Sequence, residues 1–250
     1  MTPLLAIVRV TIQQLTGRSR LIGFSLLNLV PAPLLAAVSR AANPDALDLE
    51  LGVLLVVPFF ALVVPITTLI LASSALGEER RDKTLTFLVL RPISRFQIAL
   101  AKGIAAAAVS IGFAALGALA LSLTWLAVGG SFDIFPSILL GTAVACVMYS
   151  SVFLLLGNVA QRATLVGLIY ILFFETVVVD ELPRLATGSL WRISLGATLD
   201  TMPTDFPARA LLAPLGTWVP SVGSALIVAS TVAIITIGLC TLLLHRTDAV

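Results

Sequence analysis

Six long apolar segments constrain the fold of this chain more than any other feature. A helix needs about 20 apolar residues to cross the hydrocarbon core of a bilayer, and six segments meet or approach that length: 21–39, 51–76, 103–128, 136–157, 163–179 and 220–244. Hydrophobic residues make up 59% of the sequence and charged residues only 11%, too few to cover the surface of a soluble domain. The sequence therefore predicts an all-α, multi-pass membrane protein with one transmembrane domain over residues 1–250.

The basic residues are divided unequally between the two sides of such a bundle. Eleven of the 15 Lys and Arg residues fall on the side that holds both termini. Acidic residues show the opposite bias, and Asp45, Asp133 and Asp205 are among those on the Arg-poor side. Membrane proteins keep their Lys- and Arg-rich loops in the cytoplasm. The sequence therefore predicts that both termini are cytoplasmic and that residues 180–219 form an external loop.

Residues 3–16 form a separate amphipathic segment before the first span. On a helical wheel the apolar side chains share one face and the polar ones the neighbouring face: Leu4, Leu5, Val8, Ile12 and Leu15 against Arg9, Gln13, Thr16 and Arg20. This pattern is typical of a helix that lies in the cytoplasmic membrane interface. The alternative is a cytoplasmic extension of the first span.

Small residues and prolines within the spans indicate close packing and helix bends. Small residues four positions apart let helix backbones approach each other in lipid, and three such pairs are Gly103/Ala107, Ala114/Ala118 and Gly141/Ala145. Prolines remove a backbone amide and bend helices. They occur twice in each of the first two spans, at Pro31, Pro33, Pro58 and Pro65.

The single dense cluster of charge lies in residues 77–102, which form a loop between the second and third spans. The loop contains nine charged residues of both signs. Pro92 pushes Arg91 out of helical geometry, and Ser94 followed by Gln97 forms a capping box for the next helix. The predicted form is helix, tight break, helix, with an apolar face formed by Leu85, Leu88 and Val89. Mixed charge beside an apolar face indicates a protein-docking surface; the alternative is a loop that only anchors the spans.

This loop resembles the one that follows the second span in ABC-2 type membrane subunits of ABC transporters. Members often carry the stretch Glu-(Arg)-x-x-(Gly)-Thr-Leu-x-x-Leu-Leu-x-x-Pro-Ile/Val-Ser-Arg and then a Lys at the head of the third span. The matching residues are Glu79, Arg80, Thr84, Leu85, Leu88, Pro92, Ser94, Arg95 and Lys102. Lys83 stands where the family usually has Gly, so the turn there is less free. The Ser189-Leu-Trp-Arg192 region resembles the subgroup related to the permease of nitrous-oxide-reductase maturation.

The resemblance implies an exporter fold and a division of labour. Two copies, or one copy and a paralogue, would pair around a central pathway in a bacterial cytoplasmic membrane, and a separate ABC ATPase subunit would bind ATP and Mg²⁺. The chain has no G-x-x-x-x-G-K-[ST] phosphate loop, so we expect a non-catalytic subunit without a cofactor of its own. The residues expected to couple it to the ATPase are Glu78, Glu79, Arg80, Arg81, Lys83, Thr84, Leu85, Leu88, Arg91, Pro92, Ser94 and Arg95, with Asn158, Gln161 and Arg162 in a second cytoplasmic loop.

Three polar residues within the spans are candidates for a pathway or gate, namely Tyr149, Tyr170 and Glu175. Intramembrane carboxylates are costly and often functional. Glu175 lies about five residues, or roughly 7 Å, from the outer end of its span, and this depth favours a snorkelling or packed carboxylate over a gating role. For the tyrosines, pathway lining and hydrogen bonding between helices both stay open.

Other functions have little support in the sequence. His245 is the single histidine, and no metal-ligand spacing surrounds it. The motifs of intramembrane hydrolases are absent, and no pattern indicates a nucleic-acid partner. The leading interpretation is a permease that exports an amphiphilic, drug-, peptide- or lipid-like cargo. The alternatives are a permease of a metalloenzyme-maturation transporter and a non-transporting scaffold or immunity protein that recruits an ATPase.

Overall fold

The computed structural model describes residues 3–41, 57–81, 93–178, 188–203 and 219–246, and every regular element in these ranges is helical. The α-helices are α1 (Pro3–Leu15), α2 (Arg18–Leu29), α3 (Pro31–Ala41), α5 (Val64–Arg81), α7 (Arg95–Ala127), α8 (Ile134–Val159), α9 (Ala163–Ile169), α11 (Leu190–Thr201) and α13 (Val222–Arg246). Two π-helices adjoin them: η2 (Phe59–Val63) leads into α5, and η3 (Tyr170–Val178) continues α9. The prediction of an all-α chain is confirmed.

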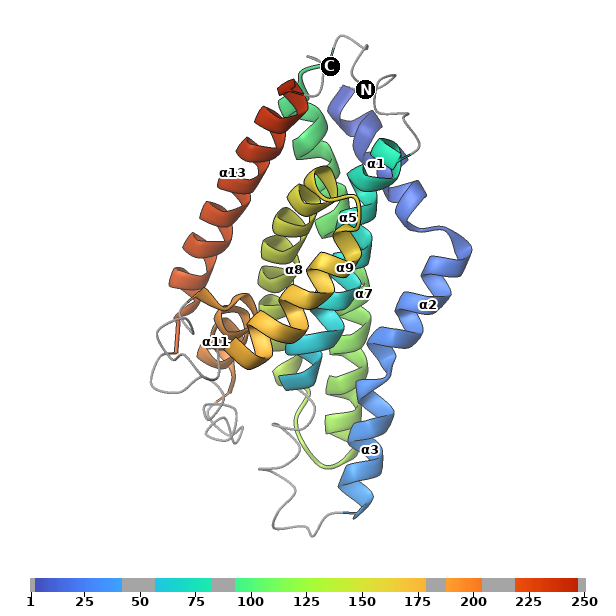
Figure 1. Cartoon of the computed structure of the whole chain (residues 1–250). Coiled ribbons are helices and arrows are strands. Elements are labelled where there is room, and N and C mark those ends of the chain that lie inside the picture. Colours follow the sequence, from blue (N-terminus) through green and yellow to red (C-terminus); the bar gives the residue numbers. More distant parts are fainter. Residues whose placement is uncertain (1–2, 42–56, 82–92, 179–187, 204–218, 247–250) are drawn as a thin grey trace.

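Helices α5 and α8 form the centre of the bundle (Figure 1). Their most apolar stretches are 72% and 67% buried, against 22% for Arg18–Ala37 and 11% for Val222–His245. Helices α7 and α9 pack beside the central pair, α1 to α3 lie along one flank, and α13 lies along the other. The helices nearest the two ends of the chain therefore leave most of their apolar side chains for lipid or for another protein.

Five helical segments are long and apolar enough to cross a membrane, within the part of the chain that the structure describes: Arg18–Ala37, Phe59–Glu79, Arg95–Ala127, Ile134–Val159 and Val222–His245. They overlap the first, second, third, fourth and sixth predicted spans. The fifth predicted span, 163–179, coincides with α9 and η3, which form a shorter apolar helix. Its crossing of the membrane stays a prediction.

One end of the bundle gathers the start of α1, the end of α5, the start of α7 and the end of α13 (Figure 1). We call it the charged end, because the ion-paired side chains of Arg20, Glu78, Glu79 and Lys102 lie there. The distribution of basic residues predicts that the charged end faces the cytoplasm.

The N-terminal helix α1 is separate from the first span. Gly17, with extended backbone (φ −57°, ψ 146°), lies between α1 and α2, so the alternative of a continuous extension of the span is wrong. Ile7 packs against Ile98 of α7, whereas Leu5 is 55% exposed. The side of α1 that packs against the protein therefore includes Ile7 and differs from the predicted apolar face, which includes Leu5.

Prolines mark two interruptions of regular helix, both distant from the charged end. Helix α3 begins at Pro31, where a missing amide N–H leaves no hydrogen bond unmade. Pro58 precedes η2, in which the amide of Val64 donates to the carbonyl of Phe59, five residues back. Pro65 follows, and it cannot supply the next amide of the ladder. The expected irregularities at Pro31 and Pro58 are confirmed.

Two glycines of α8 let neighbouring helices approach closely. A Cβ on Gly141 would lie 1.7 Å from Thr198 Oγ1 and 2.8 Å from the carbonyl oxygen of Ser194, both in α11. A Cβ on Gly157 would lie 2.5 Å from the carbonyl oxygen of Ser73 in α5. The predicted close approach at Gly141 is confirmed, while the one at Gly157 lies outside the predicted pairs.

A buried amide joins the first two spans. Asn28 of α2 is fully buried, and its Nδ2 donates to Thr67 Oγ1 of α5 (3.0 Å) and to the carbonyl of Phe24 (2.9 Å). An unpaired polar group within the hydrocarbon region costs several kcal/mol. The hydrogen bond to Thr67 therefore favours a fixed register between α2 and α5.

Candidate functional site

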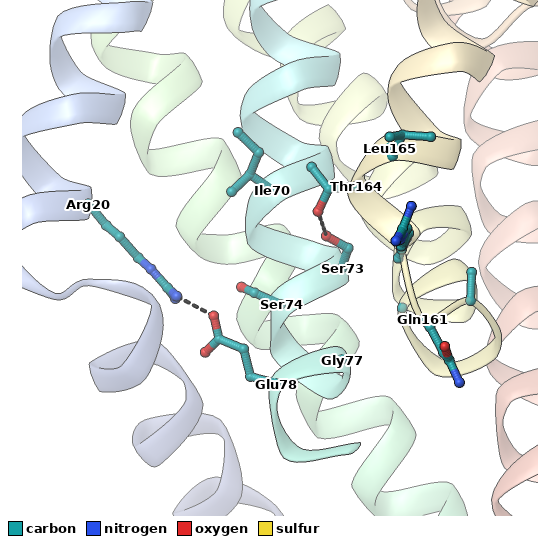
Figure 2. Close-up of a pocket in the computed structure, with 13 residues that line it drawn as sticks. Arg20, Ile70, Ser73, Ser74, Gly77, Glu78, Gln161, Thr164 and Leu165 are labelled. Atoms are coloured by element: carbon teal, nitrogen blue, oxygen red, sulfur yellow. Dashed lines mark hydrogen bonds and ion pairs between the residues drawn. The ribbon is translucent and has the colours of Figure 1, made fainter. Parts of the chain in front are cut away.

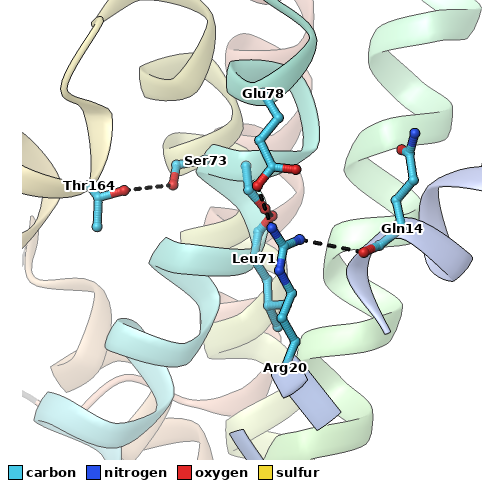
Figure 3. Close-up of polar contacts among 7 residues, drawn as sticks. Gln14, Arg20, Leu71, Ser73, Glu78 and Thr164 are labelled. Carbon is cyan, nitrogen blue, oxygen red and sulfur yellow. Dashed lines mark hydrogen bonds and ion pairs between the residues drawn. The ribbon is translucent and has the colours of Figure 1, made fainter. Parts of the chain in front are cut away.

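The last turns of α5 carry two adjacent carboxylates that contact different helices. Glu78 forms an ion pair with Arg20 at the start of α2. The other terminal nitrogen of Arg20, Nη1, lies 3.5 Å from the carbonyl oxygen of Gln14 in α1, as Figure 3 shows. Arg20 therefore links the junction of α1 and α2 to the end of α5.

Glu79 pairs with a buried lysine. The Lys102 side chain is 1% exposed, and its Nζ donates to Glu79 Oε1 (2.7 Å) and to the carbonyl oxygen of Ala75 (2.6 Å). A buried ammonium group is tolerated when hydrogen bonds and an opposite charge replace its hydration. Lys102 lies two turns into α7, and its charge fastens α7 to α5.

The start of α7 has the local structure predicted from the sequence. Ser94 is extended (φ −65°, ψ 142°), and its side chain accepts a hydrogen bond from the amide of Gln97 at 3.3 Å. Arg95 Nη1 then donates to the carbonyl oxygen of Leu244 at 2.5 Å, near the end of α13. A cation at a helix C-terminus interacts favourably with the exposed carbonyls. The cap at Ser94 is confirmed, and Arg95 joins α7 to α13.

The rest of the predicted coupling segment is described only in part. Arg80 and Arg81 belong to the last turn of α5. Lys83, Thr84, Leu85, Leu88, Arg91 and Pro92 lie outside the described residues. The tight break and the apolar face of this segment therefore stay predictions.

The second predicted loop is shorter than expected, because α8 continues to Val159. Asn158 is buried, and its Nδ2 donates to Cys240 Sγ of α13 at 3.7 Å. The placement of Asn158 in the second cytoplasmic loop is wrong, since it belongs to α8 and its side chain packs against α13. Gln161 and Arg162 lie in the turn before α9 and are exposed.

A cleft of about 870 Å³ opens at the charged end between α2, α5 and the turn that leads into α9 (Figure 2). Arg20, Glu78 and Arg162 contribute its charged groups. Ser73 and Thr164 face each other across it, with their hydroxyl oxygens 3.5 Å apart. The cleft therefore adjoins the ion pair between α2 and α5.

Glu175 is the centre of a buried polar cluster in η3. The residue is fully buried, and its carboxylate accepts four hydrogen bonds. The donors are Tyr149 of α8 (3.1 Å), Tyr170 of η3 (2.9 Å), the hydroxyl of Ser189 (2.5 Å) and the amide of Leu190 (3.1 Å). Of the two packing modes expected for Glu175, the snorkelling carboxylate is wrong and the packed one is confirmed. Both tyrosines form hydrogen bonds to it.

The segment predicted to be external contributes a helix that is buried in the bundle. Trp191 of α11 is 4% exposed, and its Nε1 donates to the backbone carbonyl of Glu175 at 3.1 Å. Every residue from Leu190 to Thr198 is buried. Helix α11 therefore packs as part of the core rather than as an amphipathic surface helix.

Three contributors to these contacts were not identified as site residues from the sequence. From the sequence, Arg20 and Lys102 contribute only to the distribution of positive charge or to the family motif. In the structure each forms an ion pair with a specific carboxylate. Ser189 precedes α11 and donates to Glu175. The available signal was that Ser189 stands directly before an apolar helical run, the usual place of a helix cap.

Comparison with known families agrees with this architecture. The family described as "ABC-2 family transporter protein" matches residues 17–178, which include α2, α5, α7, α8 and α9. A search of curated proteins finds no match. The matched region contains both ion pairs of the charged end and the Glu175 carboxylate. The chain therefore belongs to the ABC-2 transporter family and is a membrane-spanning permease subunit of an ABC transporter.

Proposed function

We propose that this permease exports an amphiphilic cargo, and that a separate ABC ATPase drives it by displacing the last turn of α5 and the segment that follows. The ATPase would hold ATP and Mg²⁺, and a second copy of the chain or a paralogue would complete the pathway. The observation that carries the proposal is the pair of adjacent carboxylates at the end of α5. Glu78 and Glu79 contact two different helices, α2 and α7.

The two ion pairs differ in strength, because their exposure differs. Lys102 is 1% exposed and Glu79 19%, and removal of one partner of a buried pair costs about 3–5 kcal/mol. The side chains of Arg20 and Glu78 are 31% and 37% exposed, and solvent-exposed pairs contribute only about 0–1 kcal/mol. Under load, α5 and α7 would therefore move together, while the contact between α5 and α2 would break first.

The arrangement at the end of α13 extends the same unit. Arg95 begins α7, directly after the segment expected to dock on the ATPase, and donates to the carbonyl of Leu244. A displacement of the docking segment would therefore reach α5 through Glu79 and α13 through Arg95. This supports a rigid unit of α5, α7 and α13 that moves against α2.

The test uses the permease purified together with its ATPase and reconstituted in liposomes. We expect Glu79→Gln to lower ATP turnover by about tenfold, because Gln cannot balance the buried Lys102 charge. A tenfold change in rate corresponds to about 1.4 kcal/mol. Glu78→Gln is expected to lower turnover by only about two- to threefold. The readouts are phosphate release and the amount of ATPase retained on the purified complex.

A matched control is Asp133→Asn, since Asp133 is exposed at the start of α8 and its side chain makes no capping hydrogen bond. This substitution removes the same charge at the opposite end of the bundle, and we expect turnover to stay unchanged. The coupling proposal is wrong if no ATPase co-purifies with the permease. It is also wrong if Glu79→Gln and Asp133→Asn affect turnover equally in complexes that contain the same amount of ATPase.

A further inference from the structure

The cleft at the charged end has a lining that changes from charged to apolar with depth. Glu78 lies at its outer edge on α5, Ser74 lies one turn further in, and Ile70 lies one turn beyond Ser74. At about 1.5 Å per residue this series spans roughly 12 Å along the helix axis. The head-group region and the first part of the hydrocarbon core of a bilayer change polarity over a similar depth.

Two glycines line the cleft where α5 crosses α8. Gly77 of α5 and Gly157 of α8 both belong to its lining, and a Cβ on Gly77 would lie 3.4 Å from the carbonyl oxygen of Gly157. Their missing side chains let the two helix backbones meet closely beside the cleft. A volume of about 870 Å³ is within the usual range of small-molecule sites.

The charge of the cleft favours an anion. Arg20 and Arg162 supply two guanidinium groups, and Glu78 supplies one carboxylate. Glu78 pairs with Arg20, while Arg162 has no ion pair within the part of the chain that the structure describes. Guanidinium groups bind phosphate and carboxylate through paired N–H donors. The hydroxyls of Ser73 and Thr164 hydrogen-bond each other, which leaves one hydroxyl proton as a donor beside these charges.

The flank of the cleft formed by α9 is apolar and exposed, because Leu165, within the lining, is 54% exposed. Exposed apolar side chains on membrane-spanning helices contact acyl chains or another helix. A molecule with its head in the cleft could therefore lay its apolar part against α9 without leaving the bilayer.

We propose that this cleft binds an amphiphile with an anionic head group that enters from the adjoining leaflet. The head would contact Arg162 and the hydroxyls, and the apolar tail would lie along the exposed face of α9. This inference rests on the proposed function, because it assigns the class of cargo. It also adds a consequence, since a head group beside Arg20 would compete with Glu78 for that guanidinium and weaken the contact between α2 and α5.

Binding can be measured on the full chain alone, in nanodiscs of a zwitterionic lipid, with fluorescent short-chain phosphatidic acid as the probe. We expect saturable binding that is at least about tenfold tighter than binding of the phosphatidylcholine with the same chains. Arg162→Gln is expected to weaken phosphatidic acid binding by about tenfold, and Arg162→Lys to restore part of it, because Lys keeps the charge but not the paired N–H donors. Arg9→Gln is the control, because Arg9 is exposed on α1 outside the cleft and its loss changes the net charge equally.

Three results would overturn the inference. The first is equal affinity for the phosphatidic acid and phosphatidylcholine probes. The second is equal weakening by Arg162→Gln and Arg9→Gln, which would indicate attraction by net charge alone. The third is displacement of the probe by inorganic phosphate at the probe's own concentration, which would indicate a site for free anions. This binding experiment contains no ATPase, so a negative result would not contradict the coupling proposal. A negative result in the ATP turnover experiment would likewise not contradict the proposed binding of an anionic amphiphile.

Discussion

Glu175→Leu is expected to destabilise the permease by about 3 kcal/mol or more. Four donors from α8, η3 and the start of α11 lose their acceptor in a fully buried site, and each unsatisfied buried polar group costs about 1–3 kcal/mol. Part of the loss is relieved because a tyrosine hydroxyl can rotate toward a new partner. The expected consequence is detachment of α11 from the bundle.

Thermal unfolding of the detergent-solubilised protein measures this effect, with tryptophan fluorescence as a local signal because Trp191 donates to the carbonyl of Glu175. Tyr149→Phe and Ser189→Ala each remove one donor, and each is expected to cost about 1 kcal/mol. The control Ser150→Ala removes a hydroxyl whose hydrogen bond, within the described residues, is to the Val147 carbonyl of its own helix. If Glu175→Leu unfolds at the same temperature as Ser150→Ala, the cluster does not stabilise α11.

Gly157→Ala is expected to cost about 1–3 kcal/mol, the usual penalty for overpacking a close contact. Its Cβ would lie 2.5 Å from the carbonyl oxygen and 3.0 Å from the Cα of Ser73. Both are backbone atoms, so α5 and α8 must separate. Separation of the two helices would also displace residues that line the cleft, so we expect weaker binding of the anionic amphiphile together with a lower unfolding temperature.

Gly77 and Gly112 provide matched controls for this substitution. A Cβ on Gly77, across the same helix crossing, would make an ordinary contact at 3.4 Å, and a Cβ on Gly112 of α7 would meet no atom of the described residues within 4 Å. Replacing either residue with Ala removes the unfavourable helix propensity of Gly, about 1 kcal/mol, and should leave stability unchanged or slightly raised. Equal unfolding temperatures for all three alanine variants would show that the crossing at Gly157 is not tightly packed.

Local features of the fold could be predicted from the sequence because their causes are local. The length and hydropathy of the apolar segments determine helices, and the position of Ser94 before an apolar run determines a cap, which the hydrogen bond from Gln97 confirms. Gly141 is similar, since a small residue four positions from Ala145 on one face already indicates close packing. The ABC-2 assignment rested on such a local motif, and the family match confirms it.

The contacts between distant residues could not be predicted in this way. Arg20 and Glu78 are 58 positions apart, and no periodicity within either helix specifies that the two helices are neighbours. In the sequence Lys102 resembles any other cation at the end of a membrane span, and only the packing of α5 beside α7 gives it a carboxylate partner. Asn158 likewise resembles a loop residue, and its burial becomes evident only from the packing of α13 against α8. These positions are determined by how the helices pack together, which one sequence without its relatives does not reveal.

Glu175 shows a different reason for an incorrect expectation. The expected depth of Glu175 in the membrane assumes one straight helix that ends near residue 179. It also assumes that the segment after this helix lies outside the membrane. Helix α11 instead packs against α8 and η3, and Ser189 and Leu190 at its start provide two of the four donors. The path from Glu175 to water is therefore covered by a segment of the same chain.

The hydrogen bond between Asn28 and Thr67 has a consequence for the biogenesis of the protein. The first span leaves the ribosome before the second. Until Thr67 arrives, the Asn28 amide would keep the Phe24 carbonyl of its own helix, but its second N–H would face hydrocarbon, at a cost of several kcal/mol. We therefore expect the first span of the native chain to insert poorly alone and to enter the membrane as a hairpin with the second. Glycosylation mapping of truncated chains would show this as low insertion of 1–50, high insertion of 1–81, and rescue of the short chain by Asn28→Leu. Efficient insertion of unmodified 1–50 would contradict it.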